Sequence, residues 1–455
     1  MPVQKGIDEV IAAIPMNRFH YILLILCGLG FCVDAMEVVL LGFISSCAGV
    51  EFGLSNAEIA SITSSVFIGA LIGSLMWGPI ADQYGRRPCY MACILTTVSG
   101  AWLSGFAPNF GWLVTLRFIV GVGVGGATVP FDIFAEFLPP NARGRSLMLI
   151  NMFWSIGAIF VTMIAMVTIP KYSWQGLIFV TAVPVTICAL VAGFVLPESP
   201  RWLISQGRYE EAHEIIMKAF QHSDVKLEPF YFDKDSLGVG AETTVRREDP
   251  RENRKFSVGD LCSTIWNGAM TTFRQYKNFL GDKSLTARTL KVGGIWFIFG
   301  VTYYGVVLLV TRMYGESAGT RSGDSSATCE FDYSDIAVNT SAEFVGLFLS
   351  TLTIDSIGRR ATQSGMYMLG AASLLILGVL RGESQSTVLI LGYIARMAAM
   401  GSSCSTWVVT PELYPTKVRA TAHSFVNALA RIGASFSPLI VASSISTLGV
   451  ALILG

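Results

Sequence analysis

The chain has 455 residues, of which 52% are hydrophobic and only 14% are charged, and its formal net charge is zero. Soluble proteins carry about 25% charged residues, so this composition excludes an ordinary soluble domain. The mean hydropathy of +0.55 agrees with that conclusion. A zero net charge gives no support for a nucleic-acid partner. The composition favours an all-α membrane protein that has the lipid bilayer as a partner.

Long apolar runs occur in two groups of six, separated by a polar stretch. A bilayer core about 30 Å thick requires roughly 20 apolar residues per helix. The last run has only about ten residues, too few to cross a bilayer. We therefore expect a polytopic fold of two six-helix bundles with a truncated last helix. The runs lie near residues 20–45, 58–80, 89–107, 112–135, 147–168, 175–196, 291–311, 336–354, 363–380, 387–410, 420–443 and 446–455.

The runs divide the chain into four expected parts. Residues 1–19 form a cytoplasmic N-terminal segment, and residues 20–196 form the first six-helix bundle. Residues 197–288 form a cytoplasmic central loop, and residues 289–455 form the second, incomplete bundle. Within the loop, residues 201–220 have apolar side chains at helical spacing, which predicts an amphipathic helix at the membrane surface.

Basic residues predict the orientation of the chain in the membrane. The short loops after the second, fourth, eighth and tenth runs carry arginines and a lysine, whereas the loops after the first and third runs carry none. Basic loops stay on the cytoplasmic side. We therefore expect a cytoplasmic N-terminus, in either the plasma membrane or the membrane of an intracellular vesicle.

Two motifs occur once in each group of runs. Asp-x-x-Gly-Arg-Arg follows the second and the eighth run, and Glu-x-x-Pro-x-x-x-Arg follows the fourth and the tenth. Asp355 follows Asp82 by 273 residues, and Glu412 follows Glu136 by 276 residues. Two unrelated motifs at nearly one offset indicate an internal repeat. Duplicated halves with a solute site between them are a common plan for transporters.

The chemistry of these motifs predicts a cytoplasmic gate. Glycine permits a tight turn, and carboxylates can accept charge-assisted hydrogen bonds from arginines across the loop. We expect these contacts to latch the two halves together; the alternative is a charge cluster that only fixes the topology. The gate residues are Asp82, Gly85, Arg86, Arg87, Glu136, Arg143, Asp355, Gly358, Arg359, Arg360, Glu412 and Arg419.

The doubled motifs resemble the signature of the major facilitator superfamily. Pro-Glu-Ser-Pro-Arg-Trp-Leu at residues 197–203 resembles its sugar-porter and organic-ion branches. Narrower matches resemble the SVOP-like (synaptic-vesicle-related) branch and bacterial niacin and aromatic-acid transporters. These matches are Asp-Ala-Met-Glu at 34–37, Ala-Glu-Phe-Leu-Pro at 135–139, Tyr-Tyr-Gly at 303–305, Cys-Glu at 329–330, and the segments 410–416 and 430–434.

The resemblance implies a carrier that works by alternating access, by proton symport or by facilitated transport. Its solute would be a small organic ion, such as a small aromatic carboxylate, and no cofactor is expected. A monomer is the expected working unit. Two alternatives stay open, namely a sugar porter and a non-transporting receptor or scaffold on a transporter fold.

Two acidic residues lie within the first apolar run. Asp34 and Glu37 are three residues apart and so share one helix face. A charged side chain at mid-bilayer costs about 2.5–3.5 kcal/mol on insertion scales, and such residues are functional by default. Either could carry a coupled proton or meet a cationic substrate. Alternatively, both pair with Arg117, Arg396 or Arg431.

The other buried ionisable residues allow similar alternatives. Arg117 could bind a substrate carboxylate through two parallel hydrogen bonds, or it could be a counter-ion to Asp34. The positions of Arg396 and Arg431, near the cytoplasmic gate or helix crossings, favour a structural role. Glu343 could line the outer half of the pathway, and Asp132 would be hydrated at its mouth.

Aromatic residues in the predicted helices could form the walls of a solute cavity. Because the chain has 9 Trp, 14 Tyr and 28 Phe, a core or lipid-facing position is the competing interpretation for each. The Tyr303–Tyr304 pair is favoured for the pathway because the following glycine indicates a helix bend. The aromatic candidates are Trp154, Trp296, Tyr303, Tyr304 and Trp407.

The remaining signals argue against catalysis. The four histidines have no nucleophile or metal spacing, and there is no nucleotide-binding P-loop, so neither an enzyme nor a metal site is expected. Cys47 and Cys329 both lie toward the outer side and could bridge. Asn339 begins a glycosylation sequon beside the eighth run, a weak signal because the sequon adjoins a helix.

Overall fold

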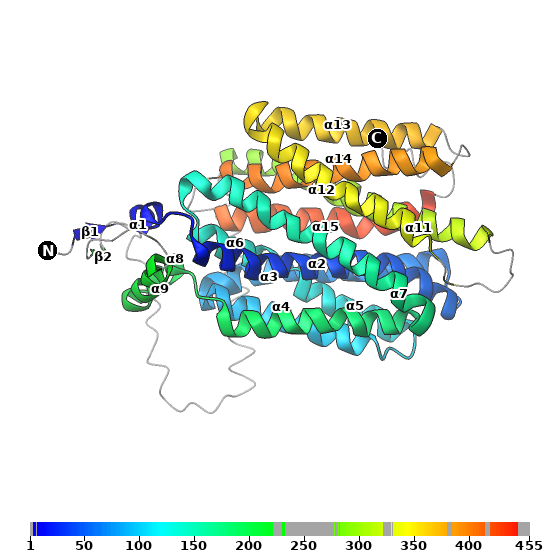
Figure 1. Ribbon diagram of the computed structural model, residues 1–455, viewed down its shortest axis with the longest axis horizontal. Helices are drawn as coiled ribbons and strands as arrows, with labels where there is room; N and C mark the ends of the chain where they lie inside the picture. Colours follow the sequence, from blue (N-terminus) through cyan, green and yellow to red (C-terminus); the bar gives the residue numbers. More distant parts are fainter. Residues whose placement is uncertain are drawn as a thin grey trace.

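The computed structural model describes residues 3–5, 7–221, 230–232, 277, 281, 283–321, 329, 331–379, 385–414 and 419–444. Long helices run side by side along the longest axis of the molecule (Figure 1). Nine helices within the described residues are long and apolar enough to cross a membrane. Large apolar side chains such as Phe194, 86% exposed, lie on their flanks. Such surfaces face lipid, and the polytopic helical fold is confirmed.

The first half of the molecule contains the six expected runs. They form α2 (Arg18–Glu51), α3 (Asn56–Tyr84), α4 (Arg86–Ser104), α5 (Phe110–Val124), α6 (Thr128–Phe137) and α7 (Pro140–Val195). The fourth run is split into α5 and α6 at a glycine-rich turn. The fifth and sixth runs together form α7, which is interrupted at Ser173, where φ is 63°.

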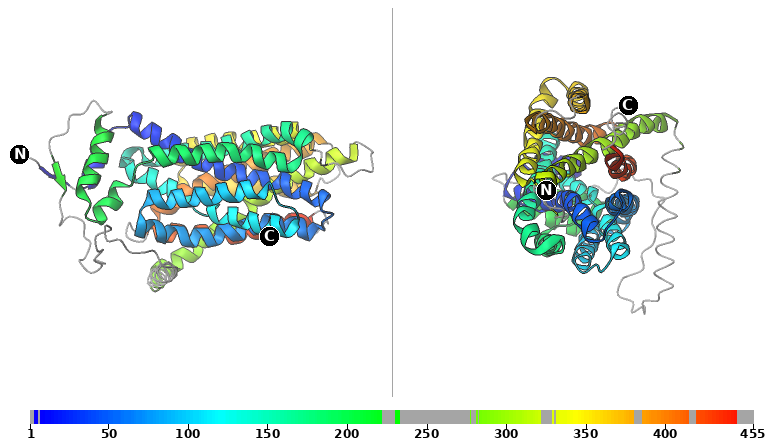
Figure 2. Two further views of the ribbon diagram at one scale, coloured as in Figure 1. Left: turned by 90° about the horizontal axis from the view of Figure 1, so that it is seen from below. Right: turned by 90° about the vertical axis from the view of Figure 1, so that its right-hand side faces the viewer.

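The second half contains five of the six expected runs within the described residues. They form α11 (Lys283–Arg321), α12 (Tyr333–Ser356), α13 (Arg359–Val379), α14 (Gln385–Glu412) and α15 (Arg419–Ser444). The last expected run, 446–455, lies outside the described residues. Seen end-on, the yellow, orange and red helices of this half lie on one side of the blue and cyan helices of the first half (Figure 2).

A small cap of short elements lies at one end of the bundle. It contains α1 (Ile7–Ala13), α8 (Pro200–Ser205) and α9 (Tyr209–Gln221). The predicted amphipathic helix is therefore two helices, and Gly207 between them has a φ of +75°. The spacing predicted an apolar face lying on the membrane surface, whereas in the structure the apolar face of α8 and α9 packs against the α1 segment. The cluster comprises Val10, Ile14, Trp202, Leu203, Ile204, Ala212, Ile216, Ala219 and Phe220.

Two short strands were not predicted from the sequence. β1 (Val3–Lys5) and β2 (Phe230–Phe232) pair in parallel beside this cap. They are three residues each, so the helical class of the fold is unaffected. We refer to the end of the bundle that carries the cap and Arg86 as the basic end. The opposite end, which carries Cys47, is the disulfide end (Figure 1).

The two halves contact each other along their whole length. Helix α3 packs against α15, and α7 packs against α12. At the disulfide end, Cys47 of α2 is bonded to Cys329, which precedes α12, as the sequence allowed. Phe43 packs beside this bond, with its ring centroid 5.0 Å from that of Phe331. At the basic end, the ring centroid of Trp407 in the second half lies 5.5 Å from that of Phe131 in the first half.

Candidate functional site

A buried ion pair joins α2 to α5 in the first half. Arg117 Nη1 lies 3.1 Å from Glu37 Oε2, and Arg117 Nε donates to Ser104 Oγ at 3.1 Å. Arg117 is 0% exposed and Glu37 is 2% exposed. Arg117 is therefore a counter-ion, but its partner is Glu37 and not the expected Asp34. Removal of one member would leave the other charge buried without a partner.

A second buried ion pair joins α12 to α14 in the second half. Arg396 donates from Nε to Glu343 Oε1 at 3.1 Å, and its Nη2 lies 3.0 Å from the same oxygen. The Tyr303 hydroxyl donates to that oxygen at 3.1 Å. The sequence analysis gave Glu343 as a candidate for the outer half of a pathway and favoured a structural role for Arg396, near the cytoplasmic gate or helix crossings. In the structure the two residues meet inside the bundle with at most 1% of each side chain exposed.

A third pair of charges faces across the two halves without a direct bond. Asp34 of α2 is 7% exposed and has no hydrogen bond or ion pair among the described residues. Arg431 of α15 is the basic residue that acts on it electrostatically. Arg431 Nη1 donates to the Tyr304 hydroxyl at 2.8 Å, whereas its buried Nε has no partner in the described part of the chain. Arg431 therefore keeps a donor for a ligand.

Aromatic side chains surround these charges. Trp154 of α7 donates its indole N–H to the Tyr303 hydroxyl at 2.5 Å, across the two halves. The Tyr304 ring lies 4.7 Å from that of Phe67 on α3, also across the halves. Three of the five predicted aromatic residues therefore lie among the buried charges. Trp296 and Trp407 instead pack together around His423, toward the basic end.

The buried charges are enclosed at both ends. The Cys47–Cys329 bond and the Phe43–Phe331 contact close the disulfide end. The Phe131–Trp407 contact closes the basic end. Because the ionisable residues between them are at most 7% exposed, the structure has the character of an occluded state. A solute could reach these residues only after the halves separate at one end.

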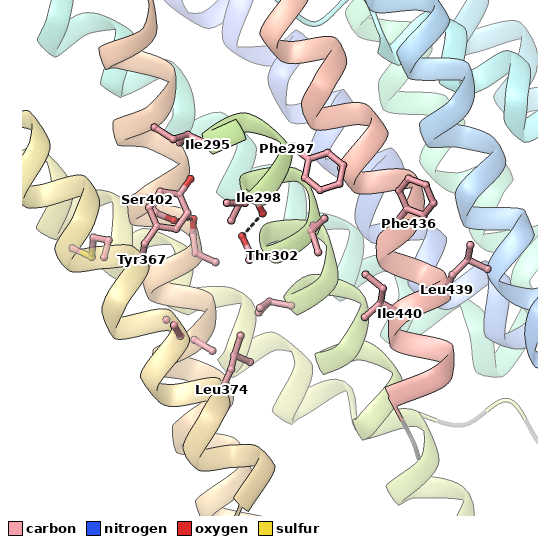
Figure 3. Close-up of a pocket in the computed structure, with 17 residues that line it drawn as sticks. Ile295, Phe297, Ile298, Thr302, Tyr367, Leu374, Ser402, Phe436, Leu439 and Ile440 are labelled. Carbon is pink, nitrogen blue, oxygen red and sulfur yellow. Dashed lines mark hydrogen bonds between the residues drawn. The ribbon is translucent and has the colours of Figure 1, made fainter. Parts of the chain in front are cut away.

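One pocket of the described residues lies away from these charges. It is a groove of about 760 Å³ on the flank of the second half, between α11, α13, α14 and α15 (Figure 3). Its walls include exposed apolar side chains such as Ile298, Phe436 and Leu439, and it contains none of the paired charges. An apolar groove on the lipid-facing flank offers no contact for a charged solute. The interface between the halves is therefore the better candidate site.

The predicted gate residues of the first half form a network at the basic end. Arg86 of α4 pairs with Asp82 near the end of α3, and its Nη2 lies 3.5 Å from Glu136 Oε1. The Trp202 indole donates to the Asp82 carbonyl at 2.9 Å. These contacts join α3, α4 and α6 of the first half to α8 of the cap. None of them joins the first half to the second, as a latch between the halves would.

Glu198 is a network member to which the sequence assigned no role. Its Oε1 accepts the backbone N–H of Arg86 at 2.9 Å and that of Arg87 at 3.2 Å, so it caps the start of α4. Burial raises the pKa of the Glu198 carboxyl, and the N–H donors of Ser199, Arg87 and Arg86 oppose that effect. Glu198 is the acidic residue of the motif at 197–203, and that position was the sequence feature from which its role could have been predicted.

We expect Gly85→Ala to destabilise this network more than Gly358→Ala does. Both glycines have positive φ, +112° and +98°, so either substitution strains the backbone by about 1–3 kcal/mol. A Cβ on Gly85 would also lie 2.5 Å from Glu198 Oε2, whereas a Cβ on Gly358 would meet nothing within 4 Å. Thermal unfolding of the purified variants in detergent measures the difference. Equal losses would contradict the role of Glu198.

The remaining predicted gate residues are exposed, or their side chains are not described. Arg359 and Arg360 are exposed at the start of α13. The side chains of Arg143, Asp355, Glu412 and Arg419 lie outside the described residues. Asp132, expected to be hydrated at a pathway mouth, is half-buried on α6.

The glycosylation prediction at Asn339 is wrong for this fold. The residue is 0% exposed, and its side-chain amide donates to the Asp335 carbonyl within α12. A glycan could not be attached to an amide that is buried inside the helix bundle. The described residues also contain no group of three or more His, Cys, Asp or Glu that could hold a metal ion.

Comparison with known proteins adds an independent line of evidence. The sequence model described as "Sugar (and other) transporter" matches residues 35–453. The chain is 30% identical to the synaptic vesicle 2-related protein of Pongo abelii, covering 95% of this chain and 75% of that one. It is 32% identical to the putative transporter svop-1 of Caenorhabditis elegans, with 95% and 79% covered. It is 26% identical to the niacin transporter NiaP of Acinetobacter baylyi, with 94% and 88% covered.

Solved structures show the same fold. A partially occluded inward-open form of the xylose transporter XylE from E. coli superposes with a TM-score of 0.69 at 16% identity, covering 96% of both chains. The membrane-spanning helices, the internal repeat and the buried charges between the halves are all features of a solute carrier. The chain is thus a multi-pass transporter of the major facilitator superfamily and belongs to its sugar (and other) transporter family.

Proposed function

We propose that this transporter carries a small organic anion, such as a small aromatic carboxylate, by proton-coupled alternating access. The observation that carries the proposal is the Arg431 guanidinium, which lies between the halves and is 2% exposed. Its Nε has no partner in the described residues, and only Nη1 is bonded, to Tyr304. A guanidinium with spare donors fits a carboxylate through two parallel hydrogen bonds.

The surroundings of Arg431 favour an aromatic anion. Tyr304 and Phe67 lie beside it, and Tyr303 and Trp154 follow along the same interface. Aromatic rings stack against a planar solute while a single polar contact fixes its orientation. The name of the niacin transporter NiaP is consistent with a carboxylated aromatic ring as solute.

The acidic residues of α2 support proton coupling. Glu37 is paired with Arg117, and Asp34 lies three residues away on the same helix under the electrostatic influence of Arg431 and Glu37. When a carboxylate solute binds Arg431, Asp34 loses the influence of that positive charge, and the carboxyl pair that it forms with Glu37 takes up a proton more readily. Entry of one anion would thereby be linked to entry of one proton. The solute and the proton would be released together on the other side.

A sugar is the second candidate solute. The family description and the xylose transporter structures favour it. Sugars bind through neutral hydroxyl and amide groups, however, and the interface presents charged groups instead. The topology that fits the basic loops has the N-terminus and the basic end in the cytoplasm. The synaptic vesicle 2-related relatives favour a vesicle membrane as its location.

The test is uptake of labelled nicotinate into proteoliposomes at acid and at neutral external pH. Saturable uptake above that of empty liposomes, rising at acid pH and unaffected by excess xylose, would support the proposal. The empty liposomes also correct for passive entry of the neutral acid. Xylose uptake in place of nicotinate uptake would support the sugar porter. Uptake of neither solute would favour a non-transporting receptor or scaffold.

A further inference from the structure

The ion pair of the second half is bonded to the first half through two aromatic residues. Trp154 of α7 donates its indole N–H to Tyr303 Oη at 2.5 Å, and Tyr303 donates its hydroxyl to Glu343 Oε1 at 3.1 Å. The two rings meet edge to face, with centroids 6.0 Å apart. This series of hydrogen bonds ends at Arg396, which donates to the same oxygen of Glu343. Trp154 is its single member from the first half.

The Glu343 carboxylate is incompletely satisfied. Arg396 Nε, Arg396 Nη2 and the Tyr303 hydroxyl all lie within 3.1 Å of Oε1. The buried Oε2 has no partner in the described part of the chain. A buried carboxylate with an unpaired oxygen depends strongly on each bond that it does make. The position of the Tyr303 hydroxyl therefore affects the charge balance of the whole pair. Trp154 fixes that position by donating to the lone pair on the far side.

The ion pair of the first half has no such connection among the described contacts. Arg117 bonds Glu37 and Ser104, and all three residues belong to the first half. The two buried ion pairs therefore differ in whether their bonding depends on a contact between the halves. The Glu343–Arg396 pair is the one whose bonding changes when the halves move apart at the level of Trp154.

We propose that Trp154 is a positioning residue that makes the Glu343–Arg396 pair depend on closure of the two halves. In the closed arrangement, Trp154 holds Tyr303 so that its hydroxyl donates to Glu343. When α7 and α11 separate, Tyr303 is released and Glu343 loses a donor. The Glu343–Arg396 pair is then held by one hydrogen bond fewer, so the bonding of the buried pair follows the conformation. The inference rests on the proposed function, because it assigns a role within that transport cycle.

The charged and titratable groups that face Glu343 come from two helices. Arg396 and Cys404 lie on α14, and Tyr303 lies on α11. Tyr303→Phe removes the hydroxyl but keeps the ring, and Trp154→Phe removes the N–H donor but keeps an aromatic side chain. Trp296→Phe is the matched control. The Trp296 indole donates to Thr410 Oγ1 at 2.8 Å, and both residues belong to the second half.

The first measurement requires no solute. Thermal unfolding of Trp154→Phe, Tyr303→Phe and the double variant in detergent forms a double-mutant cycle. We expect the two effects on the unfolding constant to be non-additive by about three- to ten-fold, the value of one hydrogen bond. If the change in the unfolding constant of the double variant equals the product of the changes in the two single variants, the proposal is overturned. This result stands whether or not nicotinate is the solute, so failure of the proposed function is distinguishable from failure of this inference.

The second measurement separates positioning from a merely structural role. Uptake is normalised to folded protein and followed as a function of pH. Trp154→Phe and Tyr303→Phe should both shift the pH profile relative to the wild type and lower the maximal rate about three- to ten-fold. Trp296→Phe should leave the pH profile in place. A Trp154→Phe profile that coincides with that of Trp296→Phe would overturn the proposal.

Discussion

Glu37→Gln is expected to abolish accumulation of the solute driven by a pH gradient. Glu37 Oε2 lies 3.1 Å from Arg117 Nη1, and both side chains are almost completely buried. Gln cannot release or accept the coupled proton, so the inward proton gradient can no longer drive accumulation of the solute. Exchange of labelled for unlabelled solute needs no net proton movement and should persist. Uptake and counterflow in the same proteoliposomes separate the two activities.

The single variant also leaves the Arg117 charge buried without a partner, which costs about 3–5 kcal/mol of stability. The double variant Glu37→Gln/Arg117→Gln removes both charges and is the control for that loss. We expect it to recover thermal stability without recovering pH-driven accumulation. If the double variant accumulates solute normally, the pair serves only folding, and Glu37 does not carry the proton.

Arg431→Gln is expected to raise the KM for nicotinate by about 10- to 100-fold, the value of a charge-assisted hydrogen bond. The Arg431 guanidinium has an unpaired Nε among the described residues and, unlike Arg117 and Arg396, no carboxylate partner there. Arg431→Lys retains the charge but lacks the planar fork, so its KM should lie between those of the wild type and Arg431→Gln. Initial rates at several nicotinate concentrations give these values.

Tyr304→Phe is the matched control for the arginine. It removes the hydroxyl that accepts from Arg431 Nη1 at 2.8 Å but leaves the charge in place. Its effect on KM should therefore be smaller than that of either arginine variant. An Arg431→Gln protein that is folded and takes up nicotinate with an unchanged KM would exclude the anion site.

The membrane-spanning helices could be predicted from the sequence, but not all of their boundaries, since the fourth run forms two helices and the fifth and sixth runs form one. Each run of about 20 apolar residues must satisfy its backbone hydrogen bonds internally in lipid, so it forms a helix wherever it is placed. The internal repeat could also be predicted, because the motifs that contain Asp82 and Glu136 recur at nearly the same offset, at Asp355 and Glu412. The amphipathic face of residues 201–220 was predicted from local spacing alone. All of these features depend on residues close together in the chain.

The pairing of charges was decided by the tertiary structure. Glu37 and Arg117 are 80 residues apart, and Glu343 and Arg396 are 53 apart. The sequence offered Arg117, Arg396 and Arg431 as candidate partners for Asp34 and Glu37 and could not decide among them. Helix rotation and tilt, which are set by packing, determine which side chains meet. The contacts of Arg86 fell within one half for the same reason.

Burial in particular could not be read from the sequence. Asn339 satisfies a glycosylation pattern, yet the packing of α12 encloses it completely. Trp154 was one aromatic residue among many until the fold brought its indole to Tyr303 of α11. Composition and the internal repeat thus determined that this protein is a two-part helical membrane protein, and the resemblance of its motifs pointed to a transporter. These signals are readable from the sequence because they act through the solvent and through neighbours along the chain. Only the fold decided which charges neutralise each other and which remain available to a solute, because that depends on side chains brought together from distant segments.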